Sequence, residues 1–305
     1  MIDTLKFKID GYSFDYGYLF EKLEEKCQFE RKTTYKYGES HVFKYKNWQF
    51  WLSKKSLTAS GSLHKLYHGD NLKPFNYSEV KLAIDSLYTL LDFDLSDAKL
   101  MQVDLAANLV MQSQVHLYFD LLTCPIGYKP MSVKNETYYF KKNDKAKELV
   151  FYDKVKEVKK NNSQLLVKDQ NLLRYEIKLK TDIVNIIGDK LLISLYDVDK
   201  YAKLVTAWYN TYSQVPKLTK LPLSDVVLTS RKDFTNSLVK KAISSLGGVE
   251  VILNKVSKSK VGKTVKYSLR QYLKELKETD YLRPELKEEL DFKVHQAYLQ
   301  HLKTS

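Results

Sequence analysis

Residues 148–157 read Glu148-Leu149-Val150-Phe151-Tyr152-Asp153-Lys154-Val155-Lys156-Glu157, an apolar run that leads one tyrosine into a group of lysines. The segment before it, residues 136–140, is rich in aromatic side chains and ends in a polar turn at residues 141–144. Two such segments around a short turn predict a β-hairpin, because aromatic and β-branched residues fit a pleated surface. Tyr152 would then lie at the end of the second strand.

Two other segments alternate between apolar and polar side chains and therefore predict β-strands with one face toward a core. The second face of residues 101–108 is small and polar, with Asp104 in its middle. The second face of residues 171–180 is wholly charged and consists of Arg174, Glu176, Lys178 and Lys180. Each strand would therefore carry one carboxylate on a polar face.

Alternation also predicts a strand at residues 2–9, and a polar turn between apolar runs predicts a hairpin at residues 41–53. Helical spacing of apolar residues predicts helices at residues 15–30, with Asp15 as the N-cap, and at residues 77–91. Residues 60–71 contain two glycines and predict a surface segment with tight backbone geometry. Residues 114–122 predict a helix or an irregular segment.

Helical periodicity dominates after residue 181 and predicts helices at residues 191–212, 234–246, 267–279 and 284–302. The fold class that follows is α+β, with a mainly antiparallel central sheet, flanking helices and a helical C-terminal region. We expect two domains. The first would cover residues 1–185, and the second, residues 186–305, would serve DNA binding or oligomerisation.

The composition suits a basic globular protein that binds a polyanion. Of the 305 residues, 50 are Lys or Arg and 37 are Asp or Glu, which gives a net charge of +13. A positive field of this size favours nucleic acid as the partner, although a generally basic soluble protein would carry it too.

The sequence also predicts a cytoplasmic protein. Cys27 and Cys124 are its only cysteines, and they form neither a metal-binding pattern nor a disulfide framework. No signal peptide is recognisable at the start, and no apolar run approaches the roughly 18 residues that a membrane span needs. ATP hydrolysis is not expected, because the Gly-Lys-Thr at residues 262–264 lacks the glycine that opens a phosphate-binding loop.

Asp104 and Glu176 are the candidate metal ligands. If their strands are neighbours, both carboxylates could converge on one Mg²⁺ or Mn²⁺ ion, which prefers oxygen ligands and leaves positions open for a phosphate. The alternative is that Glu176 pairs with Arg174 or with a lysine on a solvated face.

Tyr152 is the candidate nucleophile, with Lys154 beside it. The phenol of a tyrosine ordinarily has a pKa of about 10, so a nearby positive charge or metal is needed to favour the phenolate. Lys154 and Lys156 could supply that charge. The alternative is ordinary packing, since Tyr152 is one of 23 tyrosines.

Basic residues elsewhere are candidates for contacts with DNA. His64 and His68 would share a face of a helix, where a metal, phosphate-binding or purely structural role is open. Residues 255–266 hold five lysines and no acid, including Lys258, Lys260 and Lys263, and predict either contacts with the DNA backbone or a solvated loop.

Several of these motifs resemble one family. The opening Met1-Ile2-Asp3-Thr4-Leu5 and residues 61–66, followed by Asn71, are similar to the gene II-type replication proteins of filamentous phages and related plasmids. The segments around Asp104, Tyr152 and Glu176 also resemble the staphylococcal-type (Rep_trans) plasmid initiators, in the same order. The matches span roughly residues 1–200, and the C-terminal third is not part of them.

The resemblance implies a Rep/HUH-nuclease-like rolling-circle replication initiator that nicks and rejoins single-stranded or hairpin origin DNA. The nucleophile would be Tyr152, which would form a 5′-phosphotyrosine, and the divalent metal would be held by Asp104 and Glu176. The DNA contacts predicted are His64, Lys65, His68, Asn71, Arg174, Lys178, Lys258, Lys260 and Lys263. A host helicase and polymerase would be partners, and a homodimer is possible. No His-hydrophobe-His pair is present, so the metal site would be rich in acids.

A second hypothesis is a non-catalytic DNA-binding protein, such as a repressor or packaging factor, that retains the initiator fold. Clustering of Tyr152 with acids on polar strand faces separates the two hypotheses, because a pure binder needs the lysines and not the carboxylates, which repel phosphate.

Overall fold

The computed structural model describes residues 1–35, 38–133, 136–142, 146–160, 170–217, 235–236, 239, 249–258, 262–278 and 284–303. Within these residues, a ten-stranded sheet is the centre of the fold, and its strands follow the order β2-β3-β4-β5-β1-β6-β10-β9-β8-β7. All of its neighbouring strands are antiparallel. The strands are β1 (Ile2–Asp10), β2 (Gln28–Tyr35), β3 (Gly38–Tyr45), β4 (Trp48–Ser53), β5 (Ser56–Ser62), β6 (Lys99–Met111), β7 (Tyr128–Val133), β8 (Thr137–Lys142), β9 (Lys147–Asp153) and β10 (Asn171–Leu179).

The sheet consists of two halves with one topology, joined by the central pair β1 and β6. Counted outward from the centre, one half runs β1-β5-β4-β3-β2 and the other runs β6-β10-β9-β8-β7. In each half the innermost strand comes first in the sequence and the next strand outward comes last. The same side of the sheet is therefore built twice from equivalent strands.

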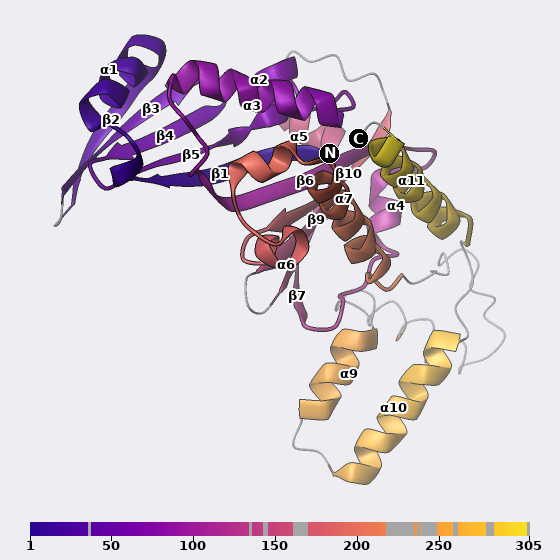
Figure 1. Cartoon of the computed structure of the whole chain (residues 1–305). Helices are drawn as coiled ribbons and strands as arrows, with labels where there is room; N and C mark the ends of the chain where they lie inside the picture. Colours follow the sequence, from indigo (N-terminus) through magenta and orange to yellow (C-terminus); the bar gives the residue numbers. More distant parts are fainter. Residues whose placement is uncertain are drawn as a thin grey trace.

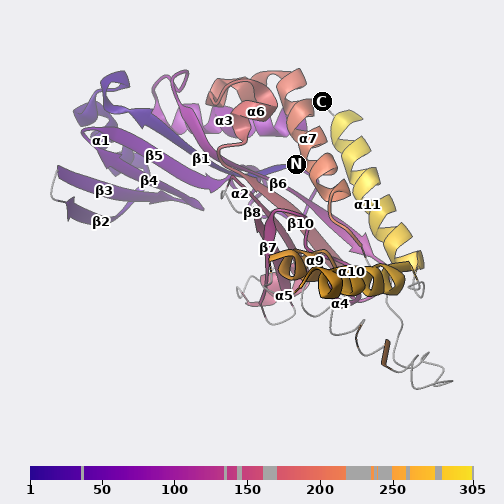
Figure 2. The same cartoon turned by 90° about the horizontal axis from the view of Figure 1, so that it is seen from below.

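Most of the helices cover the apolar side of the sheet. Figure 2 shows α1 (Tyr16–Lys26), α3 (Tyr77–Leu91), α6 (Ile183–Ile187), α7 (Val198–Ser213) and α11 (Pro284–Lys303) along one side, and α5 (Lys154–Lys160) on the other. The remaining helical segments are η1 (Gly11–Ser13), α2 (Leu63–His68), α4 (Val115–Phe119), η2 (Leu192–Tyr196), α9 (Val249–Lys258) and α10 (Lys263–Glu278).

Aromatic stacking joins the helices of the C-terminal half to the sheet. Tyr175 on β10 stacks on Phe151 of β9 with 4.6 Å between ring centroids, and Trp208 on α7 packs on Tyr175 at 4.9 Å. All three side chains are fully buried. The alternation predicted for residues 171–180 is thus confirmed for its apolar face, which forms the core.

The C-terminal helix α11 returns to the sheet and packs beside α7 and β6 (Figure 1). Leu286, Leu290 and Val294 of α11 belong to the same buried core as the sheet. Helices α9 and α10 pack on each other and bury Leu273 in a separate small cluster. The predicted boundary at residue 185 stays a prediction, and α7 and α11 on its far side share the core of the first domain.

The prediction of a surface segment at residues 60–71 was wrong. Residues 60–62 end strand β5, residues 63–68 form α2, and His64 and Asn71 are buried. Gly61 explains the error, because its role is a close approach and not a turn: a Cβ there would lie 2.5 Å from the ring of Trp48. Glycine permits the indole to lie against the strand.

Other predicted elements differ in their extent. The helix expected at residues 191–212 is a 3₁₀ turn, η2, followed by α7, because Asp197 caps a new helix by accepting from the N–H groups of Asp199 and Lys200. The N-cap role of Asp15 is confirmed, since its carboxylate accepts from the N–H of Tyr18 at 2.8 Å. The helix predicted at residues 234–246 lies mostly outside the described residues. In the described part of the chain, no helix is both long and apolar enough to span a bilayer.

Candidate active site

The polar face of three neighbouring strands brings the main predicted site residues together. Tyr152 on β9 lies directly opposite Arg174 on β10, and Lys178 on β10 lies directly opposite Asp104 on β6. Glu176 lies on β10 between Arg174 and Lys178. Because residues two apart on a strand share a face, all five side chains project from the same side of the sheet.

Arg174 is the centre of a buried ionic network. Its guanidinium donates to Asp3 at 2.5 Å, to Glu176 at 3.4 Å and to the side-chain carbonyl of Asn108 at 3.0 Å. Asp3 lies on β1, so the guanidinium reaches across β6 to meet it. Ala106 is the β6 residue opposite Glu176, and its small side chain leaves room for this crossing.

Asp3 is the site residue that the sequence reasoning missed. It is 7% exposed, and it also accepts from the Ser62 hydroxyl at 2.6 Å and from the Asn71 amide at 3.4 Å. Burial opposes ionisation of Asp3, but Arg174 and Ser62 together hold its pKa below the usual value. Its only sequence signals were an acid among apolar residues near the start of a strand and its place in the Met1-Ile2-Asp3 match.

Asp104 and Glu176 carry negative charge that the protein compensates only in part. Burial, and then the charge of Glu176, raise the pKa of Asp104 to about 8, although Gln102 donates to its carboxylate at 2.8 Å. Burial also raises the pKa of Glu176, against the opposing effect of Arg174. The predicted alternative for Glu176 is half right. It does pair with Arg174 and Lys178, yet it lies on a buried face and not on a solvated one.

These two carboxylates fit a divalent cation in donor chemistry. In the part of the chain that the structure describes, no group of three or more His, Cys, Asp or Glu side chains is arranged to hold a metal. Mg²⁺ commonly takes only one or two protein carboxylates and completes its shell with water and substrate phosphate. Diagonal neighbours on adjacent strands lie about 7–8 Å apart at their backbones, which two carboxylates can span toward one ion.

Tyr152 lines a cavity of about 310 Å³ on the polar face. Glu176 and Lys178 form part of its wall, Tyr139 lines it from β8, and Lys156 and Lys160 line it from α5. Burial raises the pKa of Tyr152 above its usual value, while Arg174 acts in the opposite direction. The phenol is therefore neutral in the free protein and needs added positive charge to ionise.

Lys154 is buried beneath this site and is not open to solvent. Its side chain is 1% exposed, and its ammonium group lies 2.6 Å from Glu157 and 5.9 Å from the centre of the Tyr152 ring. Burial lowers its pKa. Lys178 is more accessible, with a side chain 31% exposed and an ammonium group 3.7 Å from Glu176.

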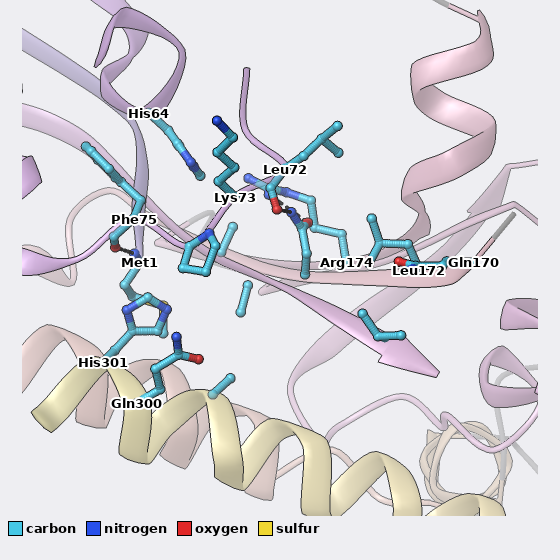
Figure 3. A pocket seen from close by; sticks show the side chains of 16 residues that line it. Met1, His64, Leu72, Lys73, Phe75, Gln170, Leu172, Arg174, Gln300 and His301 are labelled. Atoms are coloured by element: carbon cyan, nitrogen blue, oxygen red, sulfur yellow. Dashed lines mark hydrogen bonds between the residues drawn. The ribbon is translucent and has the colours of Figure 1, made fainter. Parts of the chain in front are cut away.

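A second cavity, of about 420 Å³, lies against Arg174 and next to the end of α11 (Figure 3). His64 and Arg174 line it from α2 and β10, and His301 lines it from α11. His64 stacks on Phe75 at 4.7 Å, and burial lowers its pKa to about 3, so it is a neutral side chain. Among the described residues, nothing forms a hydrogen bond with the buried Nε2 atom of His64.

The other predicted DNA contacts are spread over the molecule. Asn71 is buried, and its backbone carbonyl accepts from Asn108 and Arg174. His68 faces Glu79 at 3.2 Å, and Lys65 is half-buried on the same helix, α2. Lys258 ends α9 and Lys263 begins α10, both exposed, whereas Lys260 lies outside the described residues. The structure thus gathers Arg174 and Lys178 at Tyr152 and leaves Lys258 and Lys263 on a separate helical pair.

Comparison with known proteins supplies the family. Among solved structures, a rolling circle replication initiator protein from Geobacillus stearothermophilus is similar, with a TM-score of 0.41 and 14% identity over 77% of this chain and 89% of that chain. No curated protein sequence matches the chain at a significant level. The family model Phage_CRI, which describes the N-terminal part of a replication-associated protein, matches residues 1–211. The chain therefore belongs to this replication-associated family, and the predicted kinship with rolling-circle replication initiators is confirmed.

Proposed function

We propose that this replication protein nicks and rejoins single-stranded origin DNA by using Tyr152 as the nucleophile. The observation that carries the proposal is the shared polar face of β6, β10 and β9. There a tyrosine lines a cavity beside two buried carboxylates and a buried arginine. A protein that only bound DNA would gain nothing from acids with raised pKa values at such a place, because they repel phosphate.

The chemical step is an exchange of one phosphodiester for another. The Tyr152 oxygen attacks the phosphorus, the bond from phosphorus to the 3′ oxygen breaks, and the phenolic proton passes overall to that 3′ oxygen. The products are a 5′-phosphotyrosine and a free 3′-hydroxyl. Because one ester replaces another, the reaction can run backward and rejoin the strand.

Asp104 and Glu176 would hold the divalent cation, Mg²⁺ or Mn²⁺, whose contribution is to withdraw charge from the phosphate and to favour the phenolate. Lys178 would contact the phosphate, since it lines the cavity and remains partly exposed. Arg174 would act as a positioning residue that holds Glu176 and Asp3 in place. Lys154 would stabilise α5 beneath the tyrosine through Glu157.

The free 3′-hydroxyl fits a role in priming a host polymerase, with a host helicase to separate the strands. Origin DNA is the partner that family membership implies. The lysines of α9 and α10 would add contacts to the DNA backbone.

The test is a nicking assay on supercoiled plasmid that carries the cognate origin, with Mn²⁺ or Mg²⁺. We expect the wild-type protein to produce open circles and Tyr152→Phe to lose this activity by at least about a thousandfold, the scale on which removing a nucleophile acts. Tyr139→Phe is the matched control, because Tyr139 lines the same cavity from β8. Nicking by Tyr152→Phe at the wild-type rate would exclude Tyr152. Absence of nicking by every protein, with origin binding retained, would support a non-catalytic DNA-binding role.

A further inference from the structure

We infer that the open polar face of the N-terminal half-sheet is a track that binds single-stranded DNA beside the catalytic cluster. The inference rests on the proposed function, since the strand on the track is the one whose phosphate Tyr152 would attack. It assigns a role to β1, β3, β4 and β5, which the chemistry at Tyr152 does not use.

This face is open along the three strands next to the centre. Along residues 4–10 of β1, in β4 and along residues 56–61 of β5, every second side chain is buried, and the residues between them are partly or fully exposed. The buried set faces α1 and α3, as Figure 2 shows for the position of these helices. The side of the sheet that these helices do not cover thus presents Lys6, Lys8, Gln49, Trp51, Thr58 and Ser60.

Direct pairing lines these side chains up in rows across the strands. One row runs Gln102, Lys6, Ser60, Gln49 and Lys44, with each residue directly opposite the next. It begins at the catalytic cluster, because Gln102 donates to Asp104 at 2.8 Å. Five strands at a spacing of about 4.8 Å make this row about 19 Å long, enough for several nucleotides.

A second row, beside the first, carries the aromatic residue. Lys8 lies opposite Thr58, and Thr58 lies opposite Trp51. Trp51 is half-buried, whereas Trp48 and Trp208 have no exposed surface. An accessible indole on an open sheet is a surface on which a base can stack whatever its identity.

The charges on this face suit a polyanion. The described residues place five cations on it, Lys6, Lys8, Arg31, Lys44 and Lys99, against the carboxylates of Asp10 and Glu30. Both carboxylates are already paired, Asp10 with Lys8 and Lys99, and Glu30 with Lys44. Small hydroxyl side chains fill the centre and can donate to phosphate. Cations, hydroxyls and one aromatic ring together match a single strand with unstacked bases.

The half-sheets share one topology, which gives the two faces complementary roles. The C-terminal half places acids, Arg174 and Tyr152 on this side, where one phosphate would react. The N-terminal half places lysines and Trp51 on the same side, where the neighbouring nucleotides would be held. DNA would run across the strands from β3 toward β6 and β9.

Intrinsic fluorescence tests the track directly, because Trp51 is the tryptophan that DNA can reach. The full chain in EDTA, which prevents cleavage, is titrated with an oligothymidylate of about 16 nucleotides. We expect saturable quenching of the wild-type protein and its loss in Trp51→Phe. By anisotropy of the labelled oligonucleotide, Trp51→Ala should bind about tenfold more weakly.

The lysines are tested by the salt dependence of the same binding. Lys6→Ala combined with Lys44→Ala should lower the slope of log affinity against log salt by about 0.7 for each lysine. Lys32→Ala is the matched control, because Lys32 pairs with His41 on the opposite face of the same sheet. Equal slopes for the double variant and the control would overturn the track, as would binding without quenching.

The outcomes separate this inference from the proposed function. Quenching and weakened variants in a protein that forms no adduct on Tyr152 would keep the track and refute the tyrosine chemistry. Nicking of origin DNA by a protein whose Trp51 is never quenched would refute the track and leave the chemistry intact. Tighter binding of a duplex than of the single strand would also contradict the track.

Discussion

At the scale of single residues, Asp104 links the electrostatics of the site to pH. Its pKa of about 8 in the folded protein lies above its ordinary value of about 4 in an unfolded chain. Between these two values the unfolded chain has released a proton that the folded protein keeps. The unfolded state binds fewer protons, so the contribution of Asp104 to stability falls as pH rises from about 4 to about 8.

We therefore expect Asp104→Asn to be less sensitive to alkaline pH than the wild-type protein. Between pH 6 and pH 9 in EDTA, the melting temperature should fall further for the wild type than for the variant. Mg²⁺ should raise the melting temperature of the wild type more at pH 9 than at pH 6, because protons compete for the same carboxylate. Identical pH profiles for the two proteins would show that the acid is not held at high pKa.

Arg174 belongs to the same scale, and its loss should be costly. Replacing it with methionine leaves Asp3 and Glu176 buried without their partner, so we expect a loss of about 3–5 kcal/mol in urea unfolding. Adding Asp3→Asn to Arg174→Met should recover part of that loss, because one unpaired charge is removed. Purely additive effects would contradict the network.

At the scale of elements, the contact between Gly61 and Trp48 fixes how β4 and β5 pack. A Cβ at residue 61 would lie 2.5 Å from the indole, so Gly61→Ala should cost about 1–3 kcal/mol in urea unfolding. Ser60→Ala, one residue away with its side chain on the open face, should change stability by less than about 0.5 kcal/mol. Equal stability of the two variants would show that the indole can shift freely.

Strands with one buried face could be predicted from the sequence, and their partners could not. Leu173, Tyr175 and Ile177 alternate with charged residues, and that period alone predicts a half-buried strand. The pairing of β10 with β6 joins residues far apart in the chain, which local periodicity does not encode. Asp3 escaped notice for the same reason, because its partner Arg174 lies 171 residues away. Helix α2 was not predicted, because a glycine such as Gly61 is more typical of a turn than of a strand end.

At the scale of the whole molecule, α11 ties the C-terminal end of the chain to the sheet. Leu290 has no exposed surface, and Glu289 beside it accepts a hydrogen bond from Tyr118 of α4. We expect Leu290→Ala to lower the free energy of unfolding by about 2–5 kcal/mol. Phe292→Ala is the control, since Phe292 is 56% exposed on the same helix. A single cooperative transition should be kept by both variants, and equal stability of the two would contradict the packing of α11.

The central claim concerns one covalent bond, and one measurement tests it most directly. Full-length protein is incubated with single-stranded origin DNA and Mn²⁺, the adduct is digested with nuclease and trypsin, and the modified peptide is sequenced by mass spectrometry. The account predicts a 5′-phosphonucleotide on Tyr152, within the tryptic peptide that contains residues 148–154. An adduct on any other residue, or strand cleavage with no adduct at all, would contradict it.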